Sequence, residues 1–265
     1  MFEYLAPVVE IEIGDFIVRR IVDLKLVTGR ASPLDRADIV LPVEGLDPAA
    51  IVREAPVHIR AGYREKGLWP LFTGSVVDVA WHHQVRLLCR DRMEGLRSTR
   101  IVESFVDVTP REVVDRALDL AGVTNRQLSD SVQDRRHYFV LTGQNVIEVI
   151  RLVNRSWGLD DWAFYWEPEP DGALWWGPWE ESPRRQTGEV LRLEYGQNVL
   201  QLVPFTRERR GVVRTIFLPY LRHSQLVRIR DMRFWRQDVL VRAERIVHHV
   251  TEKKARTTLE WTLVS

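Results

Sequence analysis

The sequence predicts a mainly β protein in which two antiparallel β regions flank a small insert that contains helices. Three observations predict this class. The last stretch of the chain, 239–264, has the two-residue period of a long hairpin. Similar alternation fills 1–95 and resumes after residue 189. Between these regions, two segments with helical spacing begin and end at typical helix boundary residues.

The closing hairpin is the clearest element. Its second half places Leu259 and Trp261 on one face and Thr258 on the other. The first half, Val239–Val250, changes phase near Glu244–Arg245, which predicts a β-bulge at that point. A long hairpin at a chain end is typical of a strand pair that completes a barrel or a sandwich.

The first region opens with two strands, Pro7–Ile13 and Phe16–Val27, joined by the two-residue turn Gly14-Asp15. A short helix is expected over Asp47–Val52, because Asp47 suits the N-cap and Pro48 the first helical position. Further strands are expected over Arg36–Leu41, Pro56–Ala61, Leu71–Trp81 and Gln84–Arg90.

The middle region has helical spacing. Thr109-Pro110-Arg111-Glu112 is a capping box, and it opens a helix that ends at Gly122. A second helix is expected from Asn145 to Trp157. Two aromatic strands follow, Trp162–Trp166 and Ala173–Trp176, and the polar segment Glu180–Thr187 marks a boundary.

The last region repeats features of the first. Glu12-Ile13-Gly14 recurs as Glu194-Tyr195-Gly196, and Ile39–Pro42 recurs as Ile216–Pro219, as a duplicated β domain would show. The expected strands before the closing hairpin are Val190–Tyr195, Val199–Phe205, Val212–Leu218 and Gln225–Ile229. We therefore divide the chain into a first β domain at 1–98, an α/β insert at 99–186 and a second β domain at 187–265.

Composition indicates a folded chain, with 45% hydrophobic and 28% charged residues among 265. No apolar run of about 18 residues is present, so no membrane-spanning segment is expected. Met1–Tyr4 lacks the features of a signal peptide. The single cysteine, Cys89, excludes an intrachain disulfide and is expected to be buried and inert, which suits assembly in a reducing cytoplasm.

Net charge is +1, which argues against bulk nucleic-acid binding, but the charge is unevenly distributed. Residues 184–265 hold 17 Lys and Arg against 8 Asp and Glu, and 1–183 hold 21 against 29. The basic residues are nearly all Arg, which is favoured at protein interfaces, although a coding bias toward Arg is an equal explanation.

We expect no catalytic, cofactor-binding or metal-binding residues. The chain has two adjacent histidine pairs, His82-His83 and His248-His249; on a strand, neighbours point to opposite faces and cannot readily chelate one metal. They are interpreted as solvated or interface histidines. No HExxH, CxxC, phosphate loop or nucleophile elbow is present, so the chain is expected not to be an enzyme.

A cluster of tryptophans is the sharpest chemical feature. With Glu167 and Glu169 nearby, it suggests an alternative: a sugar-binding platform with a carboxylate pair. The favoured interpretation is that these rings fill the core of a small insert or an interface. The cluster consists of Trp157, Trp162, Trp166, Trp175, Trp176 and Trp179.

The order of elements resembles the baseplate-hub (tail hub) proteins of contractile-tailed phages and related injection systems. Leu71–Val79, with its Phe-Thr-Gly pattern, is similar to a strand segment of that family's first barrel. The helices at Thr109–Gly122 and Asn145–Gly158 resemble its insert, Tyr195–Leu200 the start of its second barrel, and Ala243–Leu263 its final hairpin. The resemblance covers nearly the whole chain, although the chain is short for the family.

The resemblance implies two tube-type antiparallel β-barrel domains flanking the insert, and a homotrimer whose six barrels form a ring. Such a ring joins the six-fold tail tube to the three-fold central spike. Implied partners are the trimeric spike protein and the tail tube or distal tube-initiator protein, with the tape-measure protein and baseplate wedge as further contacts and DNA as passing cargo. The implied location is the virion tail baseplate, assembled in the host bacterial cytoplasm. The alternative is a tail-associated carbohydrate-binding protein or peptidoglycan hydrolase that uses the tryptophans.

Overall fold

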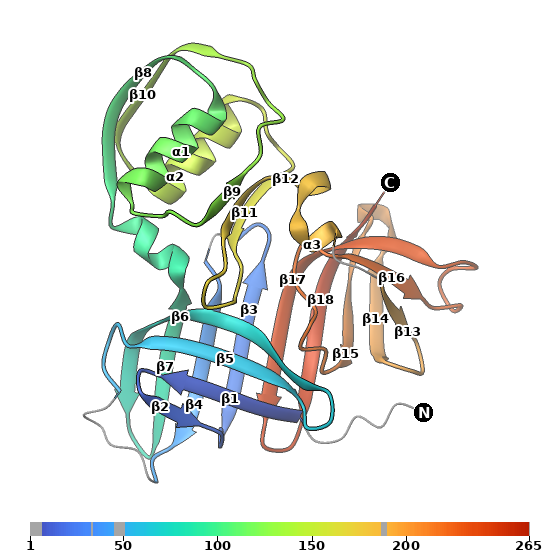
Figure 1. Ribbon diagram of the computed structural model, residues 1–265. Coiled ribbons are helices and arrows are strands. Elements are labelled where there is room, and N and C mark those ends of the chain that lie inside the picture. Colours follow the sequence, from blue (N-terminus) through green and yellow to red (C-terminus); the bar gives the residue numbers. More distant parts are fainter. Residues whose placement is uncertain (1–6, 33, 45–50, 187–189, 265) are drawn as a thin grey trace. The chain divides into compact units, whose positions relative to one another are not determined.

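The protein is described by a computed structural model that covers residues 7–32, 34–44, 51–186 and 190–264 (Figure 1). The described chain is mainly β, as predicted, and divides into two compact units. The first unit takes in both β regions, and the second holds the two longest helices. The first comprises described residues of Met1–Asp91, Pro168–Pro170 and Pro183–Ser265, and the second comprises Arg92–Glu167 and Asp171–Ser182.

The first barrel is antiparallel throughout. Its strands follow the order β3-β4-β7-β6-β5-β1-β2 and enclose a core rich in Ile, Leu and Val. In β6, a Cβ on Gly74 would lie 1.9 Å from the carbonyl oxygen of Arg90, so this close approach requires glycine. The strands are β1 (Pro7–Ile13), β2 (Phe16–Val18), β3 (Asp23–Gly29), β4 (Arg36–Pro42), β5 (Pro56–Tyr63), β6 (Gly67–Trp81) and β7 (Gln84–Asp91).

The second barrel follows the order β14-β15-β18-β17-β16-β13. Its core contains Trp261, which is 2% exposed. Two short helices belong to the same unit, α3 (Pro183–Gln186) and η4 (Thr206–Glu208). The strands are β13 (Leu191–Glu194), β14 (Val199–Phe205), β15 (Arg210–Ile216), β16 (Leu226–Arg230), β17 (Val239–Thr251) and β18 (Ala255–Leu263).

The two barrels are built on the same plan. If β1 and β2 are set aside, each barrel places its strands in one order, β3-β4-β7-β6-β5 in the first and β14-β15-β18-β17-β16 in the second. Each has a β-bulge at the same place, between Val76 and Asp78 and between Ala243 and Arg245. The predicted bulge in the closing hairpin is therefore confirmed, and it has a counterpart in the first barrel.

A backbone detail makes the correspondence residue by residue. Glu54 and Ser224 both have φ 67°, a conformation that is rare for residues with a Cβ. The N–H of Glu54 donates to Val76 O at 2.8 Å, and that of Ser224 donates to Ala243 O at 2.7 Å. The bulges and these hydrogen bonds lie at equivalent positions in the two barrels. They therefore support duplication more firmly than the short sequence repeats do.

The strand pairings also correct one of the two sequence repeats, the match of Ile39–Pro42 with Ile216–Pro219. Ile39 lies opposite Leu87 in β7, and the corresponding position opposite Leu259 in β18 is Val213. The expected match of Ile39 with Ile216 is therefore displaced by three residues. A second difference lies in the first strand of each barrel: β1 is antiparallel to β5, whereas β13 is parallel to β16.

A single strand pair joins the barrels. β3 of the first barrel pairs antiparallel with the C-terminal half of β17 in the second, from Arg245 opposite Gly29 to Thr251 opposite Asp23. We call this pairing the intrachain junction. β3 and β17 lie side by side in Figure 1, and through them both barrels share one 13-stranded sheet.

The second unit contains two small sheets and two helices. Both predicted helices are confirmed and both begin with a capping box: Glu112 N–H donates to Thr109 Oγ1 at 3.3 Å, and Glu148 N–H donates to Asn145 Oδ1 at 3.0 Å. Its elements are η2 (Arg92–Arg97), β8 (Arg100–Val108), α1 (Pro110–Leu120), β9 (Arg126–Leu128), β10 (Arg136–Asn145), α2 (Val146–Ser156), β11 (Trp162–Trp166), β12 (Leu174–Pro178) and η3 (Trp179–Glu181). In the described chain, no helix is long and apolar enough to cross a membrane.

The first region departs from the predicted elements at Phe16–Val27. The single strand expected over Phe16–Val27 is wrong, because the chain leaves β2 after Val18 and re-enters as β3 at Asp23. β2 pairs with β1, whereas β3 pairs with β4 and β17, so these residues serve opposite ends of the barrel sheet. The helix expected over Asp47–Val52 lies mostly outside the described residues.

Candidate functional surface

The intrachain junction carries a broad polar face. Because side chains alternate along a strand, every second residue of each strand points away from the barrel cores. Across the six strands from β15 to β7 these residues align in rows. One row is Arg214, Thr258, Val247, Val27, Arg36 and Arg90, and the next is Ile216, Arg256, His249, Lys25, Asp38 and Leu88. Flanking rows are Val212, Glu260, Arg245 and Gly29, and Thr251, Asp23, Val40 and Arg86.

Cations outnumber acids on these rows, which we call the cationic face. Its acids are Asp23, Asp38 and Glu260, and each is already bound to a neighbour. Arg36 Nε donates to Asp38 at 2.9 Å, and Arg245 donates to Glu260 at 2.6 Å. His249 Nε2 lies 3.0 Å from Asp23 Oδ2. The basic side chains are Lys25, Arg36, Arg86, Arg90, Arg214, Arg245 and Arg256.

Five of these cations have no acidic partner among the ion pairs of the described residues: Lys25, Arg86, Arg90, Arg214 and Arg256. Charges on one sheet face share one field, which attracts a polyanion and repels other cations. The face is thus suited to a passing or bound polyanion.

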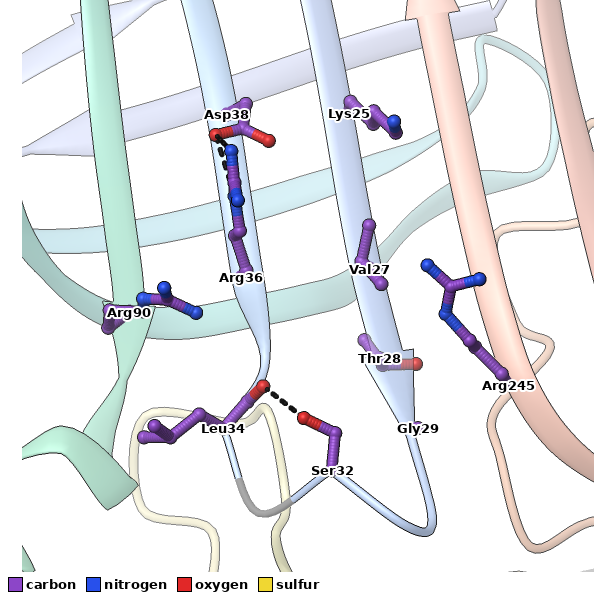
Figure 2. Close-up of a pocket in the computed structure, with 10 residues that line it drawn as sticks. All are labelled: Lys25, Val27, Thr28, Gly29, Ser32, Leu34, Arg36, Asp38, Arg90 and Arg245. Atoms are coloured by element: carbon purple, nitrogen blue, oxygen red, sulfur yellow. Dashed lines mark hydrogen bonds and ion pairs between the residues drawn. The ribbon is translucent and has the colours of Figure 1, made fainter.

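The centre of the cationic face is a shallow hollow of about 320 Å³. Figure 2 shows Arg36 and Asp38 together on β4, with Arg90 on one side and Lys25, Val27 and Arg245 on the other. The turn after β3 forms one rim, where Ser32 Oγ donates to Leu34 O at 3.0 Å. The hollow lies across the intrachain junction, so both barrels contribute to it.

This surface was not predicted from the sequence, which shows the excess of arginine after residue 184 but not the direction in which the side chains point. The sequence does carry a signal: two Arg lie four residues apart on the same face of a strand, Arg210 and Arg214 in β15 and Arg86 and Arg90 in β7. The outward side of each strand cannot be assigned from the sequence, because it depends on how the two β regions share one sheet.

His248 and His249 are neighbours on β17, whereas His82 and His83 lie in the turn between β6 and β7. The expectation that the histidines are solvated is wrong for His248. His248 is 1% exposed, and its Nδ1 lies 3.0 Å from Thr257 Oγ1. Burial, together with the charge of nearby Arg222, lowers the pKa of His248 to about 3. His249 points to the opposite face, and His82 and His83 are exposed. Among the described residues, no cluster of three or more His, Cys, Asp or Glu could hold a metal ion.

Three of the six tryptophans of the cluster lie in a core, whereas Trp157, Trp162 and Trp166 are partly exposed. Trp175 and Trp179 are each 5% exposed and Trp176 is fully buried. Trp176 Nε1 donates to Asn154 Oδ1 at 2.9 Å, and its ring centroid lies 4.5 Å from that of Trp162. Buried indoles cannot stack on a sugar ring, so these three do not form a binding platform.

Cys89 is inert, as expected. It is fully buried in β7, and burial raises the pKa of its thiol to about 12. At neutral pH it therefore carries almost no thiolate.

The whole fold was compared with known proteins. No family model and no curated protein matches this chain. Solved structures do. The 43 kDa tail protein of prophage MuSo2 from Shewanella oneidensis matches with a TM-score of 0.73 and 11% identity, over 97% of this chain and 98% of that one. A tail protein from Neisseria meningitidis MC58 matches with a TM-score of 0.71 and 11% identity, over 97% and 96%.

The chain has the fold of phage tail proteins. The tail-protein fold is also found in E. coli c3393, described as a type VI secretion component with structural similarity to T4 tail proteins gp27 and gp5. That match has a TM-score of 0.68 and 13% identity, over 92% of this chain and 74% of the other. The resemblance inferred from element order is therefore confirmed at the level of the fold.

Proposed function

We propose that the chain is the structural hub of a phage tail baseplate, or of a phage-derived injection machine, and that it acts as a homotrimer without enzymatic activity. Three copies supply six barrels in a ring. Such a ring presents six similar positions to the tail tube and three identical positions to the central spike. The adaptor role follows from this combination of symmetries.

One observation carries the proposal: a single chain holds two barrels of the same strand order, already joined edge to edge by β3 and β17. A head-to-tail repeat of this joint produces a closed ring if the rotation closes. The cationic face then lies on one side of the continuous sheet. We propose that this side lines the channel through which DNA passes.

The proposed partners follow from the ring. The trimeric spike protein binds one end, and the tail tube or its initiator binds the other. The tape-measure protein and baseplate wedge are additional contacts. The completed hub is part of the virion tail and is assembled in the host cytoplasm.

The mass of the purified chain tests this function. Light scattering is performed on the chain alone and with the spike protein of the same particle, and ring formation is checked by electron microscopy. We expect three times the 31.0 kDa chain mass, alone or after addition of the spike. A strict monomer that also ignores the spike would overturn the proposal.

A further inference from the structure

The duplication predicts a second junction like the intrachain one, and the two strand edges that would form it are both unpaired. The junction uses the outer edge of β3 and the part of β17 that follows its bulge. Because the barrels are duplicated, β14 of the second barrel corresponds to β3 of the first. The part of β6 that follows its bulge corresponds to the part of β17 that follows its bulge. In the described chain, apart from an isolated bridge between Val199 and Tyr195, no strand pairs with β14 on the side away from β15 or with Asp78–Trp81 on the side away from β7.

The first unpaired edge, β14, is an unusual edge strand. β14 has the sequence VLQLVPF, with no charged residue, and it exposes Leu200, Val203 and Phe205 by 44%, 39% and 44%. Native proteins usually protect an edge with charge, a bulge or a covering element, because an apolar edge invites another strand. An uncharged apolar edge is expected where pairing is intended.

The second unpaired edge, Asp78–Trp81 of β6, starts where the hydrogen bonds on the β5 side of β6 end. The bonds between Val76 and the segment Glu54–Ala55 are the last on the β5 side of β6. In the second barrel the corresponding bonds, between Ala243 and Ser224–Gln225, come just before the stretch of β17 that holds β3. The stretch Asp78–Trp81 therefore occupies the position at which the second barrel receives a strand.

We infer that β14 of one copy pairs antiparallel with Asp78–Trp81 in β6 of a second copy. This inference rests on the proposed ring and specifies its contact. β14 and β6 are seven strand spacings apart in the shared sheet, roughly 34 Å along a flat sheet, so a second copy is the occupant that duplication supplies. The contact is head-to-tail and leaves the same two edges open on every new copy until the ring closes.

The ladders fix the register. Val247 lies opposite Val27 in the junction, and the correspondence maps these residues to Ala80 and Phe205. Ala80 is therefore expected opposite Phe205 of the next copy, and Trp81 opposite Pro204. The intrachain junction pairs seven residues of β17, and only the first four of these have counterparts in β6, so the new ladder is shorter than the junction. Proline, which has no N–H, removes one further donor.

Cysteine cross-linking tests the register. Ala80→Cys and Phe205→Cys are combined in one chain, oxidised mildly and separated on a non-reducing denaturing gel. The native thiol does not interfere because Cys89 is buried and its pKa is about 12. The matched control combines Ala80→Cys with Leu200→Cys, which lies on the same strand but five residues, roughly 17 Å, away.

We expect a reducible ladder from the first pair, at least tenfold more intense than from the control, that ends at three chains. A trimeric mass with no more cross-linking than the control overturns the pairing and leaves the hub proposal intact. A strong ladder that ends at another number supports the pairing and overturns the trimer.

A second measurement uses the unaltered chain. Hydrogen exchange is compared between dilute monomer and assembled protein, because a new strand pair protects amides on both strands. We expect slower exchange within 78–81 and 205–207 on assembly, because the register places these residues opposite one another. Unchanged exchange in both segments would overturn the pairing whatever the behaviour of the cysteine variants.

Discussion

The hydroxyl of Tyr63 donates a hydrogen bond to the backbone carbonyl oxygen of Phe217 at 2.6 Å. Tyr63 ends β5 in the first barrel, and Phe217 follows β15 in the second, yet the ring of Phe217 belongs to the core of the first. The two rings lie 6.1 Å apart. The barrels therefore interlock through side chains as well as through the β3–β17 ladder.

Tyr63→Phe keeps the ring contact and removes this donor. The carbonyl is left buried without its partner, so we expect a loss of about 1–3 kcal/mol in the free energy of unfolding. Urea denaturation measures it. Tyr138→Phe is the control, since Tyr138 is 68% exposed, and it should change stability by less than ~0.5 kcal/mol. Equal effects of the two variants would contradict the interlock.

His248 makes stability depend on pH. Its pKa is about 3 in the folded chain, because burial disfavours its charged form, and near 6.5 when unfolded. Between these values the unfolded state binds a proton that the folded state does not, so stability falls as pH is lowered from about 6.5 toward 3. We expect the advantage of wild type over His248→Gln to shrink by about 1.4 kcal/mol per pH unit between pH 6 and pH 4. The comparison at pH 7.5 gives the baseline, and a gap that stays constant would refute the effect.

The capping box of α1 is expected to stabilise the second unit. Thr109 Oγ1 accepts from the Glu112 N–H, and the Glu112 carboxylate accepts from the Thr109 N–H at 2.7 Å. This backbone hydrogen bond lowers the pKa of Glu112. Thr109→Ala should cost about 1 kcal/mol in thermal unfolding. The exposed Thr124→Ala serves as the control, and similar losses from both would show that the cap is not the cause.

The buried tryptophans lead to opposite expectations for a core and for a sugar site. Trp175→Ala should destabilise the second unit by about 3–5 kcal/mol, because a large buried ring is removed. Wild type should neither bind peptidoglycan in a pull-down nor clear a cell-wall suspension. Glu169→Gln, at an exposed loop position, should change nothing. Binding that disappears with Trp175→Ala while folding is retained would restore the carbohydrate alternative.

The cationic face should give the assembled protein a salt-dependent affinity for duplex DNA. Lys25→Glu with Arg90→Glu removes two cations without acidic partners, so we expect affinity for a short duplex to fall by at least about tenfold and the salt dependence to become shallower. Arg151→Glu with Arg155→Glu makes the same charge change on α2 of the second unit. If both pairs weaken binding equally, the face has no special role.

Local patterns predicted most elements because their periodicity was undisturbed. The bulge near Glu244–Arg245 and the helix opened by Thr109 are examples, since phase and capping chemistry are both readable along the chain. β8 and β10 were missed because their outer face is also apolar. Val102 and Val106, 80% and 64% exposed, hide the alternation that a half-buried strand normally shows.

Long-range features were not predictable in the same way. The break after Val18 depends on which strands receive β2 and β3, and the parallel pairing of β13 with β16 depends on the path of the whole barrel. The cationic face is of the same kind. Its side chains come from six strands, and only the ladder that unites the barrels brings Arg214 and Arg90 into one row.

The intrachain junction has a kinetic consequence. Two barrels on one polypeptide meet at an effective concentration set by the connecting chain, independently of how dilute the protein is. In the proposed ring, every second contact is thus made during folding, and three chains need only two bimolecular encounters before the last contact closes the ring within the complex. Protein concentration would then affect ring formation only through the pairing of β14 with β6 between copies. The other type of contact, the pairing of β3 with β17, is already formed within each chain.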